Sequence, residues 1–208
     1  SPDSLARVED LLAACEQKNI DKLAITDHNR LDGALRAYAL DPQRVIVGEE
    51  IQTTQGEILG YFMHEEIPAG LEPLEVIRRL KDQGAFISVA HPFDPNRDVT
   101  HWQPGTLEAM LPFLDAIETF NARCLRQAYN DQAQAFAREH RLSEMAGSDA
   151  HSTFELGRAT MLLADFNNAM ELRTALQDAQ WDVRLSSAAV HLFSVWAKLI
   201  KRVRKPAL

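Results

Sequence analysis

Short apolar runs alternate with longer amphipathic segments along most of the chain. The runs are at most six residues long and end at polar or turn residues, so they predict buried strands rather than helices. The predicted strands cover residues 23–25, 44–47, 58–63, 85–90, 115–120, 143–146, 159–164 and 181–185. Apolar residues at helical spacing predict helices from the first residues to Cys15 and over residues 73–83, 123–140, 168–179 and 188–204.

The order of these elements predicts the fold class. Strands that alternate with helices form a parallel sheet covered by helices, as a closed barrel or an open doubly wound sheet. A turn near Gln55 and Gly56 separates two apolar runs and allows the run at 58–63 to pair as a hairpin. We expect one α/β domain over residues 1–187. A basic amphipathic helix over residues 188–208 follows it, packed on the domain or extending from it to an anionic partner.

Composition narrows the class of protein. The chain has 208 residues, of which 46% are hydrophobic, so one sizeable core is expected. The net charge of −8 argues against non-specific binding of nucleic acid by the whole domain. No apolar run approaches the length of a membrane span, and we expect a cytoplasmic protein without stable membrane insertion. Cys15 and Cys124 fall in helical apolar patterns and are expected to be buried thiols.

The polar residues at the ends of the predicted strands indicate chemistry. Five strands end in side chains that ligate metals or donate hydrogen bonds: Asp27 and His28, Glu50, His91, Asn121, and Asp149 and His151. In a parallel barrel all strand carboxyl ends open on one face, so these residues would converge there. Imidazoles and carboxylates together suit Zn, Mn or Fe, and a carboxylate such as Glu50 can bridge two ions. Paired ions are the usual clamp for a displacement at phosphorus.

Several strings of the sequence resemble one known family. They are Ala24-Ile25-Thr26-Asp27-His28-Asn29, Gly48-Glu49-Glu50-Ile51, Gly56-Glu57-Ile58-Leu59, Ala90-His91-Pro92-Phe93-Asp94, Ile117-Glu118-Thr119-Phe120-Asn121 and Gly147-Ser148-Asp149-Ala150-His151. In order and spacing they resemble the PHP (polymerase and histidinol phosphatase) family. The resemblance implies a distorted (β/α)7 barrel that binds two or three divalent metal ions. It also implies hydrolysis of phosphomonoesters, nucleotides or short nucleic acids.

The resemblance also implies roles for single residues. His28 and His151 resemble ligands of the third metal, with Asp27 in or near that coordination shell. Glu50, rather than the adjacent Glu49, resembles the carboxylate that bridges two metals. The remaining assignments are His91 as a ligand of the second metal, Asp149 as a ligand of the first, and Asn121 as a ligand or as an amide that orients water or phosphate.

One part of the family pattern is missing from the chain. The family begins with a strand that carries a His-x-His pair, and no such strand precedes the first predicted helix. Two ligands of the first metal and one barrel strand are thereby absent. We interpret this as loss of the true N-terminus, with a naturally degenerate member as the alternative.

The functional hypothesis is metal-dependent hydrolysis of a phosphoester by a metal-activated water. Arg97, Arg123 and Arg158 follow strand ends and are candidates to bind the phosphate of a small phosphorylated substrate or a short nucleic acid. The alternative from another class is a degenerate, non-catalytic PHP-type module that serves as a structural or interaction domain. An amidohydrolase acting on C–N bonds is a third reading, but the barrel-end lysine of many such enzymes is not found here.

Overall fold

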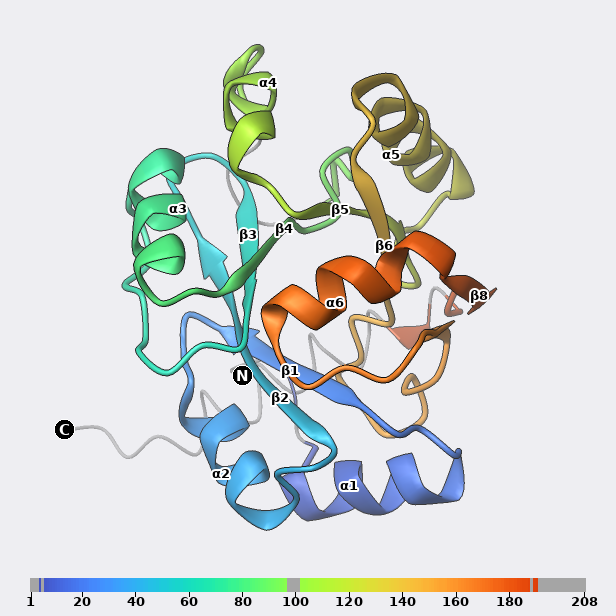
Figure 1. The fold of residues 1–208 in the computed structure, drawn as a ribbon. Coiled ribbons are helices and arrows are strands. Elements are labelled where there is room, and N and C mark those ends of the chain that lie inside the picture. The colour runs from blue at the N-terminus through green and yellow to red at the C-terminus, as the bar shows by residue number, and fades with distance from the viewer. Residues whose placement is uncertain (1–3, 5, 97–101, 188, 191–208) are drawn as a thin grey trace, which may run out of the picture.

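A curled six-stranded sheet with helices on its outer side forms the body of the molecule (Figure 1). The computed structural model describes residues 4, 6–96, 102–187 and 189–190. The strand order follows the sequence, β1-β2-β3-β4-β5-β6. All strands of this sheet run parallel except β3, which is antiparallel to both of its neighbours. The predicted α/β class is confirmed as an open, curled half-barrel.

The bounds of the elements differ from the predicted ones mainly at their ends. The strands of the sheet are β1 (Leu23–His28), β2 (Val45–Gln52), β3 (Glu57–Tyr61), β4 (Phe86–Val89), β5 (Ala116–Asn121) and β6 (Ser143–Gly147). The helices are α1 (Val8–Gln17), α2 (Asp32–Leu40), α3 (Pro73–Asp82), α4 (Thr106–Met110), α5 (Gln127–His140) and α6 (Ala169–Ala175), with 3-10 turns η1 (Leu111–Phe113) and η2 (Leu176–Asp178). The pattern of apolar residues did not predict α2 and α4.

The hairpin β2–β3 reverses the chain, so the amino end of β3 lies at the edge of the sheet that the carboxyl ends of the other strands form. Gln52 and Glu57 are paired across it, and the turn closes through a hydrogen bond from the Thr53 amide to the Gly56 carbonyl at 3.0 Å. Gly56 has a φ of +72°, and a Cβ there would lie 2.3 Å from the Trp102 ring. Only glycine therefore fits this turn.

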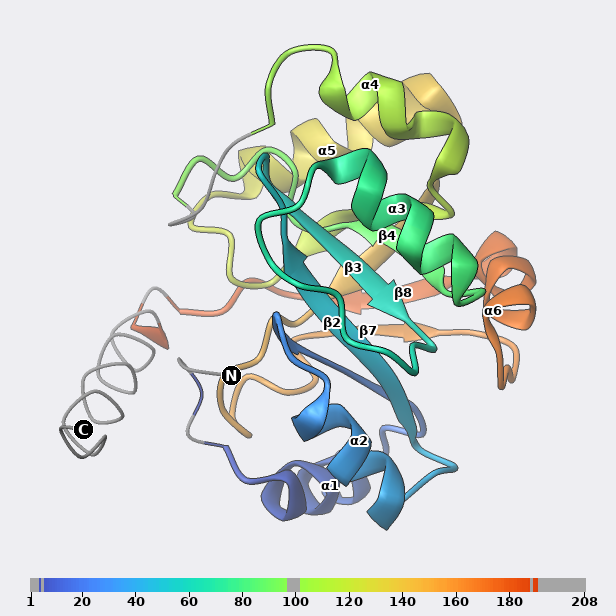
Figure 2. The same cartoon turned by 90° about the vertical axis from the view of Figure 1, so that its left-hand side faces the viewer.

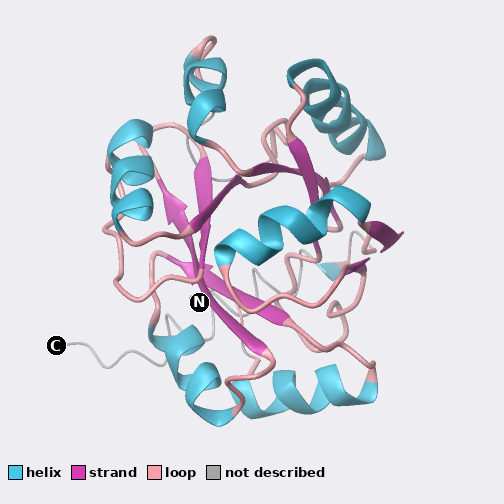
Figure 3. Cartoon of the chain, in the orientation of Figure 1, coloured by secondary structure: helices cyan, strands magenta, loops and turns pink. Residues whose placement is uncertain are grey.

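Alternation along the strands divides the sheet into two chemically different faces. The outer face carries Ile25, Val47, Ile51, Ile58, Ile87 and Ile117, which form one core with residues of the covering helices. The inner, concave face carries Ile46, Leu59, Tyr61 and Phe86, which pack against Phe166 and Leu172 of the α6 segment. Figures 1 and 3 show α6 lying across the open side of the sheet. The apolar inner layer occupies the middle of the concave face, and the polar residues of the next subsection lie toward the carboxyl ends of the strands.

The last two predicted strands do not join the main sheet. β7 (Ala159–Leu162) and β8 (Gln180–Val183) pair only with each other, antiparallel, in a separate two-stranded ribbon. Figure 2 shows this ribbon behind the hairpin of β2 and β3. The prediction of one sheet with strands and helices alternating throughout was wrong for this segment. Short strands of four residues carry too little pattern to distinguish a sheet strand from a ribbon.

Two predicted features lie outside the described residues. They are Arg97 and nearly all of the basic helix expected over residues 188–208. Within the described residues, no helix has the length and apolar character that crossing a lipid bilayer requires.

The close approach of β2 and β3 at Gly48 predicts a large effect of a single methyl group. A Cβ on Gly48 would lie 2.6 Å from the carbonyl oxygen of Gly60, a backbone atom that cannot rotate away. We expect Gly48→Ala to lower the free energy of unfolding by about 3 kcal/mol, the upper end for overpacking. Urea denaturation of the variant and of wild type measures this difference in the free energy of unfolding. Gly84→Ala is the control, since its methyl meets nothing within 4 Å and only its φ of +69° costs energy, about 1 kcal/mol. Equal losses would contradict the steric explanation.

Candidate metal centre

Two histidines and two glutamates converge on the inner face at the carboxyl edge of the sheet. His28 is in register with Glu50 of the parallel neighbour, and Glu57 enters from the hairpin. The Nδ1 of His28 lies 3.4 Å from an oxygen of each glutamate. The Nε2 of His91 lies 3.1 Å from Glu50 and 3.4 Å from Glu57, on the other oxygen of each. Each carboxylate is thus shared between the same two imidazoles.

This cluster has the chemistry of a divalent metal site. Single donor atoms of His28, Glu50 and Glu57 all lie within 4.8 Å of one another. Both glutamates and His91 are buried, so their lone pairs are directed into the protein rather than to bulk water. Burial acts to raise the pKa of Glu50, but the adjacent His28 and His91 outweigh it and lower that pKa. The carboxylate stays ionised as a ligand requires, and imidazole with carboxylate suits Zn, Mn or Fe.

Glu118 of β5 holds the neighbouring residues in place. Its Oε2 accepts hydrogen bonds from the His91 amide at 2.8 Å and from the Asn121 side chain at 3.0 Å. His91 has a φ of +26°, which non-glycine residues seldom adopt, so the bond to its amide supports a strained backbone. Burial raises the pKa of Glu118 to about 7. A Cβ on Gly147 would lie 2.0 Å from Oε1 of Glu118, so glycine at that position leaves the room that this carboxyl occupies.

Asn121 and Asp149 lie beside this carboxylate. The Asn121 amide donates to Asp149 Oδ2 at 3.3 Å, which connects the ends of β5 and β6. The backbone of Asn121 is held from α5, because Asn130 accepts from its N–H at 3.0 Å and donates to its carbonyl at 3.2 Å. Both side chains therefore have a fixed position in the cavity.

His151 is held by a buried ion pair. Glu155 accepts from the His151 amide at 3.1 Å and lies 3.4 Å from Nε of Arg123, with each side chain of the pair only 3% exposed. Arg123 also contacts the ring Nδ1 of His151, and the ring lies 6.2 Å from that of His28, measured between centroids. The sequence predicted Arg123 as a candidate phosphate ligand; in the structure it contacts His151 and Glu155 and is not among the residues that line the cavity described below.

Alternation along the strands separates Asp27 and Glu49 from the cluster. They are in register with each other, one position before the pair His28 and Glu50, and so belong to the opposite face. The carboxylate of Asp27 lies against Gly33 at the start of α2, where an added Cβ would be 2.2 Å away. Glu49 is fully buried and accepts from the Ile67 amide at 3.0 Å, and burial raises its pKa to about 7. The structure thus brings Glu50, and not Glu49, to the histidines.

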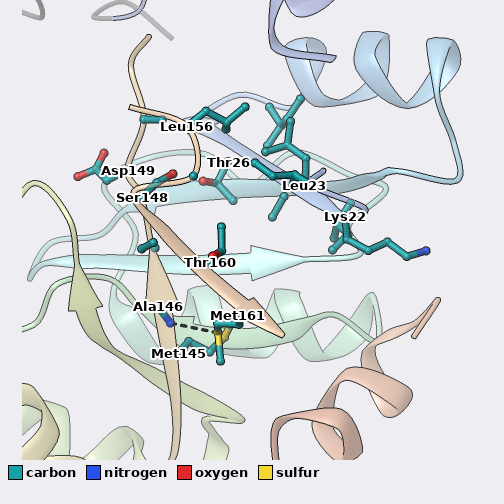
Figure 4. A pocket seen from close by; sticks show the side chains of 18 of the residues that line it. Lys22, Leu23, Thr26, Met145, Ala146, Ser148, Asp149, Leu156, Thr160 and Met161 are labelled. Atoms are coloured by element: carbon teal, nitrogen blue, oxygen red, sulfur yellow. Dashed lines mark hydrogen bonds between the residues drawn. The ribbon is translucent and has the colours of Figure 1, made fainter. Parts of the chain in front are cut away.

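A cavity of about 1080 Å³ lies on the inner face of the half-barrel between β1 and β6, and Ile46, Leu59 and Phe166 of the apolar layer form part of its lining. Figure 4 shows Thr26 and Leu23 on one wall, and Asp149 and Ser148 near the strand ends. Met145 and Met161 form an apolar part of the lining, where the Ala146 amide donates to the sulfur of Met161 at 3.3 Å. Of the candidate site residues, Asp27, His28, Glu50, Glu118, Asn121, Asp149 and His151 all line this cavity, whereas His91 and Glu57 do not. Arg158 does not, and it lines a second, adjoining cavity.

Sequence reasoning assigned no role to two residues of the centre, Glu57 and Glu118. Glu57 follows a predicted turn and begins a strand, so a rule that searches only for strand ends overlooks it. The hairpin itself was the available signal, because antiparallel pairing puts the start of one strand beside the end of the other. Glu118 lies inside a predicted strand between apolar residues, and a buried carboxylate in such a run is itself unusual.

The chain matches one family model and is similar in sequence to two curated proteins. A family model described as PHP-associated matches residues 127–180. Two uncharacterized proteins of Methanocaldococcus jannaschii are similar in sequence. MJ0417 is 38% identical over 74% of this chain and 62% of its own length, and MJ1587 is 37% identical over 58% and 70%. The chain therefore spans less than two thirds of MJ0417.

Solved structures with the same fold share little sequence. A two-domain protein of Bacteroides vulgatus, described as containing a predicted PHP-like metal-dependent phosphoesterase, has a TM-score of 0.67 and 19% identity over 88% of this chain and 61% of its own. PsfC of Pseudomonas syringae has a TM-score of 0.62 and 17% identity, covering 94% and 88%. A Bifidobacterium adolescentis protein, provisionally assigned as a metal-dependent phosphoesterase, has a TM-score of 0.62 and 16% identity, covering 84% and 92%.

Proposed function

This chain belongs to the PHP family, and from that premise we propose that it hydrolyses phosphoesters with the help of divalent metal ions. The observation that carries the proposal is the sharing of the buried carboxylates of Glu50 and Glu57 between His28 and His91. Two of these four donors, His28 and Glu50, line an open cavity, and this suits a metal site better than a structural ion-pair network. A purely structural role would not require them to face a cavity.

The residues that would hold the ions are those of the cluster and of the adjoining strand ends. His28, Glu50, Glu57 and His91 form the first group, and Asp149, His151 and Asn121 form the second. Asp27 remains a prediction, because its carboxylate faces Gly33. Bound divalent ions would lower the pKa of a water and neutralise charge on the phosphoryl oxygens.

The other residues position this machinery. Glu118 fixes the backbone of His91 and the amide of Asn121, and Glu155 with Arg123 fixes His151. The Asn121 amide is directed at Asp149 and can orient a water or a phosphoryl oxygen beside it. The substrate class that fits is a phosphomonoester, a nucleotide or a short oligonucleotide.

The test is phosphate release from mononucleotides, sugar phosphates and short oligonucleotides, with Mn²⁺, with Zn²⁺ and with EDTA. We expect release that requires a metal and that disappears in His91→Ala. His64→Ala, a change of an exposed histidine outside the centre, is the control and should retain full activity. Absence of release with every metal would overturn the proposal and favour a non-catalytic module.

A further inference from the structure

The ribbon β7–β8 carries two arginines that face each other without a carboxylate partner. Thr160 and Asp182 are paired across the ribbon, and two positions further along the Arg184 amide donates to the Arg158 carbonyl at 2.8 Å. Arg158 and Arg184 are therefore directly opposite and lie on the same face as Thr160 and Asp182. Among the described residues, neither guanidinium forms an ion pair or a side-chain hydrogen bond. Like charges in this position destabilise a ribbon unless an anion lies between them.

The two arginines line a cavity of their own. It has a volume of about 460 Å³, and its other charged residues are Lys18 and Asp182. Three cations and one carboxylate leave the cavity positively charged in a chain whose net charge is −8. The ammonium of Lys18 is already bound to the carbonyls of Thr153 and Leu156, at 2.9 and 2.6 Å, so the arginines are the donors left for a ligand.

An exposed aromatic ring stands at the same cavity. Phe154 is 88% exposed, the highest value among the large hydrophobic residues described, and it lines the cavity with Arg158 and Arg184. It lies three residues after His151, in the loop that Lys18 ties down. Guanidinium groups bind phosphate oxygens in a bidentate manner, and an exposed ring offers a stacking surface for a nucleobase.

The second cavity continues from the first. Lys18, Leu156, Thr160 and Asp182 line both, so a ligand can extend from the carboxyl edge of the sheet to the ribbon. We propose that Arg158 and Arg184 bind a non-reacting phosphate of a nucleotide-type substrate while Phe154 stacks on its base. The assignment of this ligand as substrate rests on the proposed function, whereas the binding site itself does not.

Ligand binding in the absence of metal tests the ribbon site independently of the proposed phosphoester hydrolysis. Calorimetric titration in EDTA of wild type and of His91→Ala with adenosine 5′-monophosphate, ribose 5-phosphate and inorganic phosphate measures the ribbon site alone. We expect adenosine 5′-monophosphate to bind both proteins equally. Arg158→Gln and Arg184→Gln should each raise its Kd about tenfold, as expected for one charge-assisted phosphate contact. Arg138→Gln removes an equal charge from α5, outside both cavities, and should leave Kd unchanged.

Phe154→Ala tests the aromatic surface. It should raise the Kd of adenosine 5′-monophosphate about tenfold, within the range for loss of one stacked base, and leave ribose 5-phosphate unchanged. The arginine variants should keep or raise the Tm of wild type, because each removes one of two facing like charges. Phe154→Ala should leave the Tm unchanged, because that side chain is exposed. An unchanged Kd in the double variant Arg158→Gln/Arg184→Gln, or no binding of any probe to wild type, would overturn the site. Equal binding of the nucleotide and the sugar phosphate would overturn the role of Phe154. Failure of phosphate release in the metal assay leaves all of these results intact.

Discussion

Metal-dependent phosphate release by Glu50→Gln is expected to fall by more than about a hundredfold relative to wild type. Loss of a hydrogen-bonding partner of a metal ligand already costs about 10- to 100-fold. Glu50 is itself a proposed metal ligand, and its two oxygens lie 3.4 Å from His28 and 3.1 Å from His91, so its loss should cost more. The amide removes the negative charge and one acceptor at the same position. Initial rates at saturating Mn²⁺, with Mn²⁺ affinity from calorimetry, measure both consequences.

The adjacent residue provides a matched control for this change. Glu49→Gln has the same chemistry one residue earlier, on the face away from the cluster, and it preserves an acceptor for the Ile67 amide. We expect it to keep the Mn²⁺ affinity and turnover of wild type. Equal losses in Glu49→Gln and Glu50→Gln would show that the two faces of β2 are not distinguished by metal binding, and the assignment of the centre would be wrong.

The second large effect is on stability. Glu155→Leu is expected to lower the free energy of unfolding by about 3–5 kcal/mol, the usual cost of leaving one buried charge without its partner. The reason is that Arg123 is equally buried and lies 3.4 Å from Glu155. Arg123→Met should have a cost of the same order. The double variant should recover most of the loss, because replacing both members of a buried pair by apolar residues is often close to neutral.

Metal binding distinguishes this explanation from a general loss of packing. Glu155 also accepts from the amide of His151 and from the hydroxyl of Ser152, and no apolar side chain restores those bonds. The double variant should therefore regain stability in urea denaturation but not the Mn²⁺ affinity of wild type. Recovery of both would mean that the pair does not position His151.

The sequence predicted where the metal centre lies better than it predicted which residues form it. Residues such as His28, Glu50 and His91 come at the ends of buried strands, and a parallel sheet brings such ends together. The pattern ended the second strand at residue 47, because the apolar run stops there and Gly48, Glu49 and Glu50 follow it. In the structure β2 continues to Gln52, and this extension with β3 brings Glu57 into the centre.

The partners of the arginines could not be read from the sequence. Arg123 follows a strand end as a phosphate ligand would, and only the fold shows that Glu155, 32 residues later, is buried against it. Arg158 was predicted as a candidate to bind the substrate phosphate, and in the structure it lines a second cavity with Arg184. Pairing between strands β7 and β8 depends on tertiary contacts that four-residue patterns do not encode.

The tight turn between β2 and β3 also bears on the order in which the centre assembles during folding. Only residues 53–56 separate the two strands, and hairpins of this kind form within about 1–10 μs. His28 reaches its partners only after α2 has crossed to the sheet, and His91 only after α3 has done so. We therefore expect the refolding chain to bring the two carboxylates together before it supplies the imidazoles that balance their charge. On this order of events, a dissolved divalent cation would meet its first two carboxylate ligands in the hairpin, before the half-barrel has formed.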